Sequence, residues 1–310
     1  MTQTPSALFD SANFVVLYIR CDAFERCLRA HGLSATQLAV LLKLEEIDGA
    51  ETAIQDLAEL VRVQPNVVTQ AANELERLGF AERCTRSGDG RSKYLLVTKR
   101  GREFLSQFDG ELYVALEDLF SPEGGMQIRD VFERGLRIGA RVGELWSESF
   151  VERYPSATNL VAVTSFLRRV ERELRKGEGT TLSEARVLQR LDEVSLPMRV
   201  VDLSTYLRLP AATVTRAASK LEQSGLVERL VSRHDRKAVY FDLTDKGRLS
   251  AASIERTLNR LSNEMYWGRL PADDLSVTDR IKEHTLAVIR SAEQRERDER
   301  LAALESAARR

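Results

Sequence analysis

Residue types and motifs that mark several protein classes are scarce or absent in this chain of 310 residues. Its three cysteines, Cys21, Cys27 and Cys84, are odd in number and lack zinc-finger or zinc-ribbon spacing, which argues against a disulfide-stapled secreted domain. No apolar run approaches the roughly 18 residues that cross a membrane. The first residues lack the basic lead and the small-residue cleavage site of a signal peptide. We therefore expect a protein of the reducing cytoplasm with no membrane partner.

Signatures of catalysis are also missing. The chain has three histidines, which are scattered, and it has no HExxH motif, no phosphate-binding glycine loop and no Ser/His/Asp arrangement. Cys27 and His31 stand four residues apart on one helical face and could share a metal ion, but the second half of the chain has no counterpart. We expect no enzymatic activity, no cofactor and no bound metal.

What the sequence does contain is an internal duplication. The segment LERLGFAERCTRSGDGRSKYLLVTKRG at 75–101 returns as LEQSGLVERLVSRHDRKAVYFDLTDKG at 221–247, with nine of 27 positions identical and a constant offset of 146. A period of this length indicates two copies of a domain, because solenoid repeats have periods of 20–50 residues. We predict domains at 1–150 and 151–310, with core units at 33–102 and 182–248.

Helix signals open each copy. A first amphipathic helix is expected at about 8–31, with a stripe formed by Phe14, Leu17, Cys21, Phe24 and Leu28. The next helix starts in LSATQLAVLLKL, where Ser34 and Gln37 predict a capping box and Leu33 and Leu38 a hydrophobic staple. The second copy repeats this start as LSEARVLQRL, with Leu182 and Val187 as the staple and no Gln at N3.

A winged helix-turn-helix pattern follows in both copies. Short helices are predicted at 53–61 and 199–207, and longer helices at 65–78 and 211–224, ended by Gly79 and Gly225. Two β-type runs flank a polar turn in each copy, at 80–86 and 92–98 and at 226–232 and 238–244. Thr98 and Thr244 are candidate N-caps for the helix after each wing.

Long amphipathic segments come after each wing, at about 99–119 and 125–148 and at 245–266 and 272–305. Each is too apolar on one face to remain alone in water, so each requires a partner helix. SESFVERYPSATNL at 147–160 is the best candidate for a linker, with Pro155 as its breaker. The predicted fold is mainly α with small β-wings: two winged helix-turn-helix domains plus long interlocking helices.

These residues resemble the MarR family of bacterial transcription regulators, in tandem. The resemblance rests on ATVTRAASKLEQSGLVER, DRK and LTDKG in the second copy and on NVVTQAANELERLGFAER, DGR and VTKRG in the first. Members of that family are usually homodimers with interlocking terminal helices. The resemblance therefore implies a monomeric pseudo-dimer that supplies both DNA-reading heads in one chain, with association of two such chains left open. It also implies a cytoplasmic bacterial protein that lies at the nucleoid when bound.

The second helix of each helix-turn-helix is expected to enter the major groove. Val68, Ala72 and Leu75, and their counterparts Val214, Ala218 and Leu221, should face the core. We predict that Arg216 pairs with guanine and that Gln70 or Asn66 suits adenine. Lys220 against Glu74 is a charge reversal at equivalent positions, so the two half-sites should differ. The predicted DNA-contacting residues of these helices are Gln64, Asn66, Thr69, Gln70, Ala212, Thr213, Thr215, Arg216 and Lys220.

The wings carry further basic residues. The predicted contacts to the minor groove or to phosphates are Arg86, Asp89, Arg91 and Lys93 in the first wing, and Arg233, Asp235, Arg236 and Lys237 in the second. The resemblance implies that Asp89 orients Arg91; Lys237 at the equivalent position lacks the planar guanidinium, so Arg233 or Arg236 would take that role. Residues 62–102 have a net charge of +5 and residues 208–248 of +4, which leaves −10 for the other 228 residues. Such a distribution fits a polyanion that touches the two copies.

Other features have a structural and a functional interpretation. Glu76, Arg83, Glu222 and Arg229 favour local ion pairs or caps over base contacts. Cys21 and Cys27 could sense oxidants, but buried cysteines are commonly inert. Six aromatic residues could line a pocket for a small aromatic or phenolic effector, although such residues more often form core: Phe14, Tyr18, Tyr113, Trp146, Tyr266 and Trp267.

The leading hypothesis is a sequence-specific regulator of transcription, most simply a repressor relieved by a small ligand, with double-stranded DNA as its partner and an asymmetric or pseudo-palindromic operator. The alternative is a pair of winged helices that dock proteins and bind no DNA. Basic residues at both recognition helices and wings favour the first hypothesis, and salt-dependent binding to a duplex separates the two.

Overall fold

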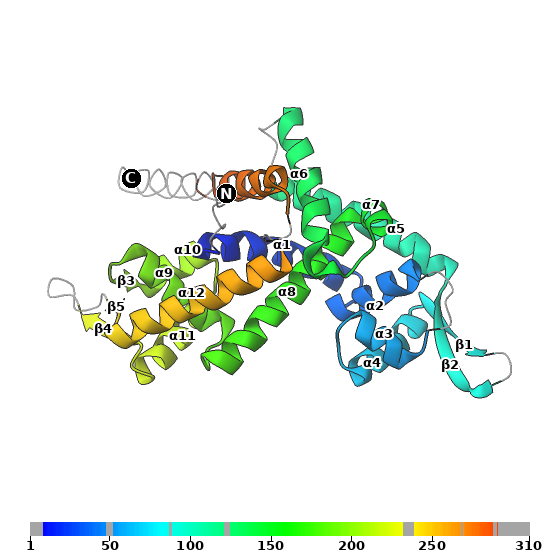
Figure 1. Cartoon of the computed structure of the whole chain (residues 1–310), viewed down its shortest axis with the longest axis horizontal. Coiled ribbons are helices and arrows are strands. Elements are labelled where there is room, and N and C mark those ends of the chain that lie inside the picture. Colours follow the sequence, from blue (N-terminus) through cyan, green and yellow to red (C-terminus); the bar gives the residue numbers. More distant parts are fainter. Residues whose placement is uncertain are drawn as a thin grey trace, which may run out of the picture.

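The structure, a computed structural model, describes residues 9–47, 52–86, 89–120, 125–231, 239–266, 268, 270–287 and 290. The side chains of residues 86, 89–93, 120, 125–128 and 231 lie outside that description. Two lobes, which we call the heads, lie at opposite ends of the long axis, and long helices join them across the middle (Figure 1).

The first copy follows the order that the sequence predicts: a long helix, three shorter helices, a β-hairpin and two further helices. These elements are α1 (Ser11–Ala30), α2 (Ala35–Glu46), α3 (Ile54–Leu60), α4 (Pro65–Arg77), β1 (Ala81–Arg86), β2 (Asp89–Val97), α5 (Lys99–Phe120) and α6 (Gly125–Ala140). In the first head, α3 and α4 form the helix-turn-helix, and the antiparallel pair β1–β2 forms the wing.

The second copy repeats this order. Its elements are α8 (Pro155–Gly177), α9 (Leu182–Val194), α10 (Val200–Leu207), α11 (Ala211–Gln223), β4 (Val227–Val231), β5 (Val239–Leu243) and α12 (Asp245–Met265), followed by helical residues 272–287. Strands β4 and β5 are antiparallel. The prediction of a mainly α fold with two winged helix-turn-helix units is therefore confirmed.

One strand was not predicted. β3 (Met198–Arg199) pairs antiparallel with β5, so the second head has a sheet of order β3-β5-β4. The equivalent place in the first head holds a single bridge between Ala53 and Tyr94. Two residues are too few to show the alternation by which a strand is recognised. In both heads this pairing fixes the start of the short helix against the wing.

The predicted helix ends are largely confirmed. Ser34 and Gln37 form the capping box of α2. Gly79 and Gly225 follow the recognition helices with φ of +74° and +69°, the left-handed conformation that glycine adopts without strain. The start of α9 differs from the prediction. Thr181 is the N-cap and Glu184 is at N3, so α9 has a capping box although the sequence analysis found no Gln at N3.

The predicted linker at 147–160 is wrong. The segment contains α7 (Glu148–Arg153), which follows the short 3₁₀ helix η1 (Val142–Glu144), and then the first turns of α8. Pro155 starts α8 at its first position, where its missing N–H costs nothing. Tyr154 and Ala157 are buried in the first head, so the chain passes between the copies through the core. The domain boundary between residues 150 and 151 stays a prediction.

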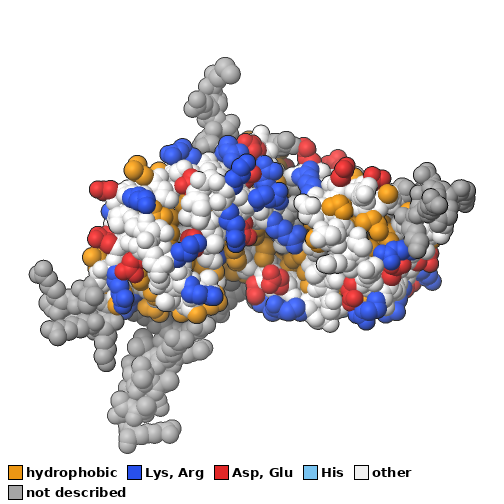
Figure 2. Space-filling view, turned by 90° about the horizontal axis from the view of Figure 1, so that it is seen from below, with side chains coloured by type: hydrophobic (Ala, Val, Ile, Leu, Met, Phe, Trp, Pro, Cys, Tyr) orange, Lys and Arg blue, Asp and Glu red, His pale blue; other side chains and the backbone are white. Residues whose placement is uncertain are grey.

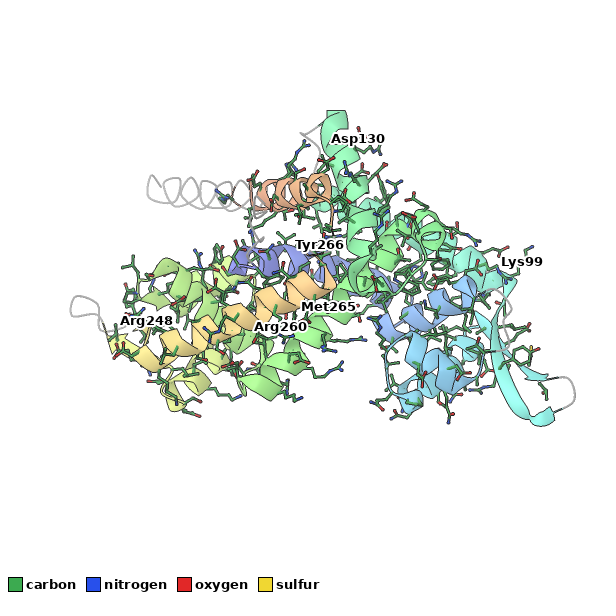
Figure 3. All side chains as sticks on the ribbon, viewed as in Figure 1. Lys99, Asp130, Arg248, Arg260, Met265 and Tyr266 are labelled. Atoms are coloured by element: carbon green, nitrogen blue, oxygen red, sulfur yellow. The ribbon has the colours of Figure 1, made fainter. Side chains whose placement is uncertain are left out.

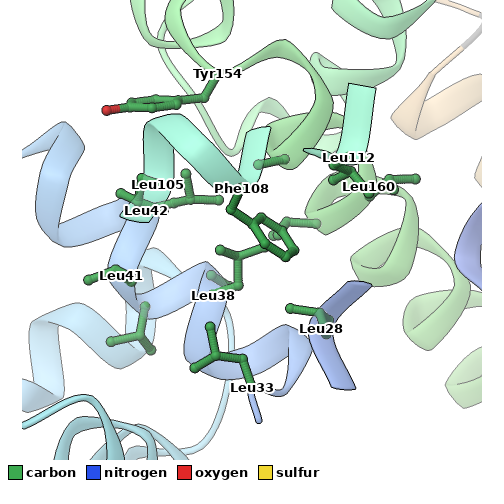
Figure 4. Packing of buried hydrophobic residues seen from close by; sticks show 14 of the residues in the cluster. Leu28, Leu33, Leu38, Leu41, Leu42, Leu105, Phe108, Leu112, Tyr154 and Leu160 are labelled. Carbon is green, nitrogen blue, oxygen red and sulfur yellow. The ribbon is translucent and has the colours of Figure 1, made fainter. Parts of the chain in front are cut away.

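The first helices of the two copies are exchanged between the heads. Phe14 and Cys21 of α1 lie in the hydrophobic core of the second head. Tyr154 and Leu160, at the start of α8, lie in the core of the first head, where they pack near Phe108 of α5 (Figure 4). Fully burying a side chain of this size stabilises the fold by about 1.5–3 kcal/mol. Each head thus completes its core with residues from the other copy.

Buried polar contacts join the exchanged helices. The carboxylate of Asp109 on α5 accepts a hydrogen bond of 2.7 Å from the backbone N–H of Ala157, in the first turn of α8. The guanidinium of Arg20 on α1 donates to the amide oxygen of Asn159. The Asn159 amide nitrogen donates in turn to the carbonyl of Leu136 at 2.7 Å. All three side chains are buried.

A glycine conserved between the two copies tests the junction of wing and helix. A Cβ at Gly101 would collide with the carbonyl oxygen of Phe80, and a Cβ at Gly247 would collide in the same way with that of Leu226. We expect Gly101→Ala to lower the free energy of unfolding by about 1–3 kcal/mol. Gly110→Ala, in the exposed middle of the same helix with open space around it, should raise it by about 0.5–1 kcal/mol. Thermal unfolding of both variants checks this, and equal melting temperatures would contradict it.

Asp109 predicts a dependence of stability on pH. Burial raises the pKa of its carboxyl to about 6, although the N–H groups of Ala157 and Ser156 oppose the shift. An unfolded Asp titrates near 3.9, so the folded chain holds the proton more tightly and loses stability as the pH rises from about 4 to 6. The ionised carboxylate should therefore cost about 3 kcal/mol at pH 7.

Asp109→Asn keeps an oxygen acceptor without the charge. We expect this variant to be at least as stable as the wild type at pH 7 and to lose most of the decline between pH 4 and pH 6, measured as free energy of unfolding in urea. Asp118→Asn, an exposed change on the same helix, is the control. If the free energy of unfolding of the Asp109 variant still fell by the wild-type amount between pH 4 and pH 6, the pH dependence would come from other groups.

Candidate nucleic-acid interface

The recognition helices α4 and α11 lie on the same side of the molecule, at the bottom of Figure 1. Their apolar stripes face inward as predicted, since Val68, Ala72 and Leu75 are buried in the first head and Val214, Ala218 and Leu221 in the second. The opposite stripe of each helix therefore faces outward, on the side that Figure 2 shows.

The predicted contact residues of the first recognition helix are all exposed: Gln64, Asn66, Thr69 and Gln70. Those of the second are exposed too, at Ala212, Thr215, Arg216 and Lys220, apart from Thr213, which is half-buried. Thr69 and Thr215 occupy equivalent positions, and each hydroxyl donates a hydrogen bond to a carbonyl of its own helix, at 2.9 Å and 2.8 Å. In this conformation those two hydroxyls retain only an acceptor for a ligand. The role of the whole set stays a prediction.

Lys220 and Glu74, the charge reversal at equivalent positions, have different ion-pair partners. Lys220 Nζ lies 3.0 Å from Oε1 of Glu184, a nearly buried side chain at the start of α9. Glu74 pairs at 2.5 Å with Arg77 on its own helix, and the hydrogen bond from this guanidinium lowers the pKa of the Glu74 carboxyl. The second head thus holds its lysine against an acid, which the sequence did not predict.

The wing residues are placed only by their strands. The side chains of Arg86, Asp89, Arg91 and Lys93 lie outside the description, and Arg233, Asp235, Arg236 and Lys237 lie outside the described residues. The described strands do bring both hairpins to the outer ends of the molecule, beyond α4 and α11 (Figure 1). The orientation of Arg91 by Asp89 stays a prediction.

Residues predicted to be structural are so in the first head. Arg83 Nη1 lies 2.7 Å from Glu76 Oε2, and Arg83 also donates to the amide oxygen of Asn73 at 2.6 Å. These contacts tie β1 to the recognition helix. The equivalent Glu222 and Arg229 are exposed.

The cysteines and His31 have the surroundings of structural residues. Burial raises the pKa of Cys21 to about 12, and burial also raises the pKa of Cys27. His31 Nε2 lies 2.7 Å from a carboxylate oxygen of Glu111. Within the described ranges, no group of three or more His, Cys, Asp or Glu is arranged to hold a metal ion.

The five described members of the six aromatic residues pack in or against the two hydrophobic cores, which is the interpretation that the sequence favoured. Phe14 is in the second core and Tyr113 packs on Phe132, while Trp146 stacks under the ammonium group of Lys43. Tyr18 packs against Arg186. Trp267 lies outside the described residues.

Tyr266 lines a small cavity at the centre of the molecule, at the end of α12 (Figure 3). The cavity has a volume of about 80 Å³ and is bordered by α1, α6, α8, α12 and the 272–287 helix. Arg20 and Ser262 line it, and within the described part of the chain Arg20 Nε and Ser262 Oγ have no hydrogen-bond partner. Buried polar atoms without a partner are rare and point to an occupant.

None of the helices in the described ranges combines the length and the hydropathy needed to cross a membrane.

Comparison with known proteins finds one family model twice along the chain. The MarR family model matches residues 33–93 and residues 180–239. The chain is 28% identical over 96 residues to the transcriptional repressor MprA of Escherichia coli (strain K12), which covers 31% of this chain and 54% of that protein. The chain thus spans about half the length of the curated relatives it matches.

Two solved structures each align with less than half of this chain. The regulator BldR from Sulfolobus solfataricus aligns with 38% of this chain and 84% of its own, at 24% identity and a TM-score of 0.35. A mutant MarR from E. coli complexed with operator DNA aligns with 45% of this chain and 99% of its own, at 23% identity and a TM-score of 0.38.

The ion pair at Lys220 generates a prediction for the candidate interface. Glu184→Gln retains an N3 side chain that can complete the capping box, but it releases Lys220. An ion pair with an exposed lysine is worth about 0.2–1 kcal/mol, so we expect the Kd for duplex DNA to fall by up to about fivefold at fixed salt. Glu255→Gln, which removes an equal charge from α12, is the control. A weaker complex for the Glu184 variant would show that the pair positions Lys220 for binding.

Proposed function

From the premise that this chain belongs to the MarR family, with two family domains in tandem, we propose that it is a sequence-specific DNA-binding regulator of transcription. The two heads would read neighbouring half-sites of one operator. Since both heads belong to one polypeptide, a single chain would be the binding unit.

One observation carries this proposal: α4 and α11 lie on the same side of a single interlocked body, with their predicted contact residues exposed. A two-headed helix-turn-helix protein places its second helices in successive major grooves, about one helical turn apart. Lys and Arg side chains gather over the middle of this face, between the heads (Figure 2). Positive charge there supports a polyanionic partner over a protein partner.

The two half-sites would differ. Arg216 is exposed on α11 at the position where α4 presents Gln70, and an arginine fork suits guanine whereas an amide suits adenine. Lys220 and Glu74 add opposite charges at equivalent positions. We propose an asymmetric operator, with the guanine contact under the second head.

The direction of control would be repression, because the relative MprA is named a transcriptional repressor. A small ligand in the central cavity would relieve it. The cavity is bordered by helices of both copies, so an occupant would change how they pack and hence the spacing of the heads. The unpartnered Arg20 Nε and Ser262 Oγ favour a small acidic or phenolic effector.

The proposal is tested by selecting binding sites from random duplex DNA at stated salt, with the mass of the free chain measured alongside. We expect two unlike half-sites about one helical turn apart, and a monomer in solution. Arg216→Ala should cost about 1–3 kcal/mol and relax the base preference in one half-site. Gln70→Ala should relax the other half-site and serve as the reciprocal control.

Two outcomes contradict the proposal. Selected sites that are perfect palindromes would remove the asymmetry, and a chain that prefers no duplex at low ionic strength would remove DNA binding.

A further inference from the structure

A group of arginines outside the predicted interface lies where the second copy crosses the first head. Arg168, Arg169 and Arg172 on α8 and Arg62 after α3 line one hollow of about 140 Å³. We call these four residues the arginine surface. All four side chains are exposed. The opposite, apolar side of α8 is buried and includes Phe166 and Val170.

Among the described residues, no acidic side chain lines this hollow, although Glu144 and Glu264 line a neighbouring hollow with Arg62 and Arg169. Arg169 Nε lies 3.1 Å from Glu173 on the same helix. Arg168 makes a long contact of 3.5 Å with the hydroxyl of Thr36, in the first turn of α2. In the residues that the structure describes, Arg62 and Arg172 pair with no carboxylate. Several cations gathered in a concave surface with few acids attract an anion more strongly than isolated surface cations do.

Arg62 is held there against its backbone preference. It has φ of +56°, and Arg208 at the equivalent position of the second copy has φ of +52°. The left-handed region costs a residue with a Cβ about 1–2 kcal/mol, and glycine would avoid that cost. A strained residue at the turn of a helix-turn-helix, repeated in both heads, points to a use for its side chain.

The arginine surface adjoins the start of a recognition helix. Arg62 stands two residues before Gln64, the N-cap of α4. The same hollow is lined by Val61 and Val63 of the turn between α3 and α4. The hollow therefore lies between the first head and α8. Figure 2 shows Lys and Arg side chains gathered between the two heads on the face of the recognition helices.

The second head lacks an equivalent surface. The α1 residues that match Arg168 and Arg169 are Asp22 and Ala23. Arg26, which matches Arg172, forms an ion pair with Asp22. Residues 168–176 contain five Lys/Arg and two Glu, whereas residues 22–30 contain two of each sign. Of these two matching helices, α8 is therefore the basic one.

We propose that the arginine surface binds the phosphate backbone of operator DNA in the spacer between the two half-sites, on the side of the first head. This inference rests on the proposed function and adds contacts that neither the recognition helices nor the wings supply. Phosphate contacts carry no sequence information, but they fix the register of a protein on its site. The heads would thus be placed by a third, one-sided contact.

The test compares full-length variants on the selected operator. Arg168→Gln, Arg169→Gln and Arg172→Gln are combined in one variant, and Arg62→Gly is made separately. The Gly variant removes a cation while relieving the left-handed backbone, so its melting temperature should be equal to or above that of the wild type. Arg280→Gln is the matched control, since Arg280 is an exposed arginine on the 272–287 helix, on the side away from the recognition helices.

The readouts are the salt dependence of the Kd and the phosphates protected by each protein. Each lost phosphate contact should reduce the slope of log K against log salt by about 0.9, so we expect a fall of about 2.7 for the triple variant and about 0.9 for Arg62→Gly. Phosphate-ethylation interference should lose its signal in the spacer next to the half-site of the first head. The half-site sequence preferences should be unchanged.

Several results would overturn the inference. Slopes and interference patterns equal to those of the wild type and of Arg280→Gln would overturn the arginine surface alone and leave the proposed function standing. A small phosphorylated compound that competes with spacer binding would assign the surface to that compound instead. A wild-type chain without preference for any duplex would overturn both proposals.

Discussion

Neither head of this protein can close its hydrophobic core without a helix from the other copy. Phe14 of α1 fills the second head, and Leu160 of α8 fills the first. Each exchanged side chain is fully buried, so separating the heads would expose several apolar surfaces together. The crossing of α1 and α8 therefore sets the distance between the recognition helices, and any change in that crossing would reach both heads.

The crossing also contains charge, which makes it specific. Asp109 receives the first turn of α8, and Arg20 on α1 contacts Asn159 on α8. Buried groups of this kind are weak evidence for added stability, because their removal from water offsets much of the attraction. They are strongly directional, however, and a helix shifted by one turn would leave them without partners. We infer that they fix the register in which the two copies cross.

The elements of each head could be predicted because their signals are local. Apolar spacing predicted the buried faces of α4 and α11, and Gly79 and Gly225 marked the ends of these helices. The predicted linker failed because Pro155 has two local meanings, as a breaker and as a first helical residue, and only the packing of Tyr154 and Ala157 decides between them.

Other features depend on tertiary contacts, which the sequence pattern does not predict. The pairing of Lys220 with Glu184 joins helices that are 36 positions apart in the chain, and no periodicity predicts it. From the sequence alone, the arginines of α8 are indistinguishable from an ordinary solvated helix face. Only the fold shows that they lie beside the turn that contains Arg62. The unlike residues of the two recognition helices could be compared directly, because the offset of 146 aligns them.

The contact between Arg20 and Asn159 is one-sided. The residue that matches Arg20 in the second copy is Phe166, and the residue that matches Asn159 in the first copy is Asn13, which caps the start of α1. A symmetric homodimer is unchanged when it is rotated by half a turn about its two-fold axis. This molecule has no such symmetry, since its two halves differ in sequence. Operator DNA bound as we propose would acquire a polarity, and inverting that site would turn the protein end for end.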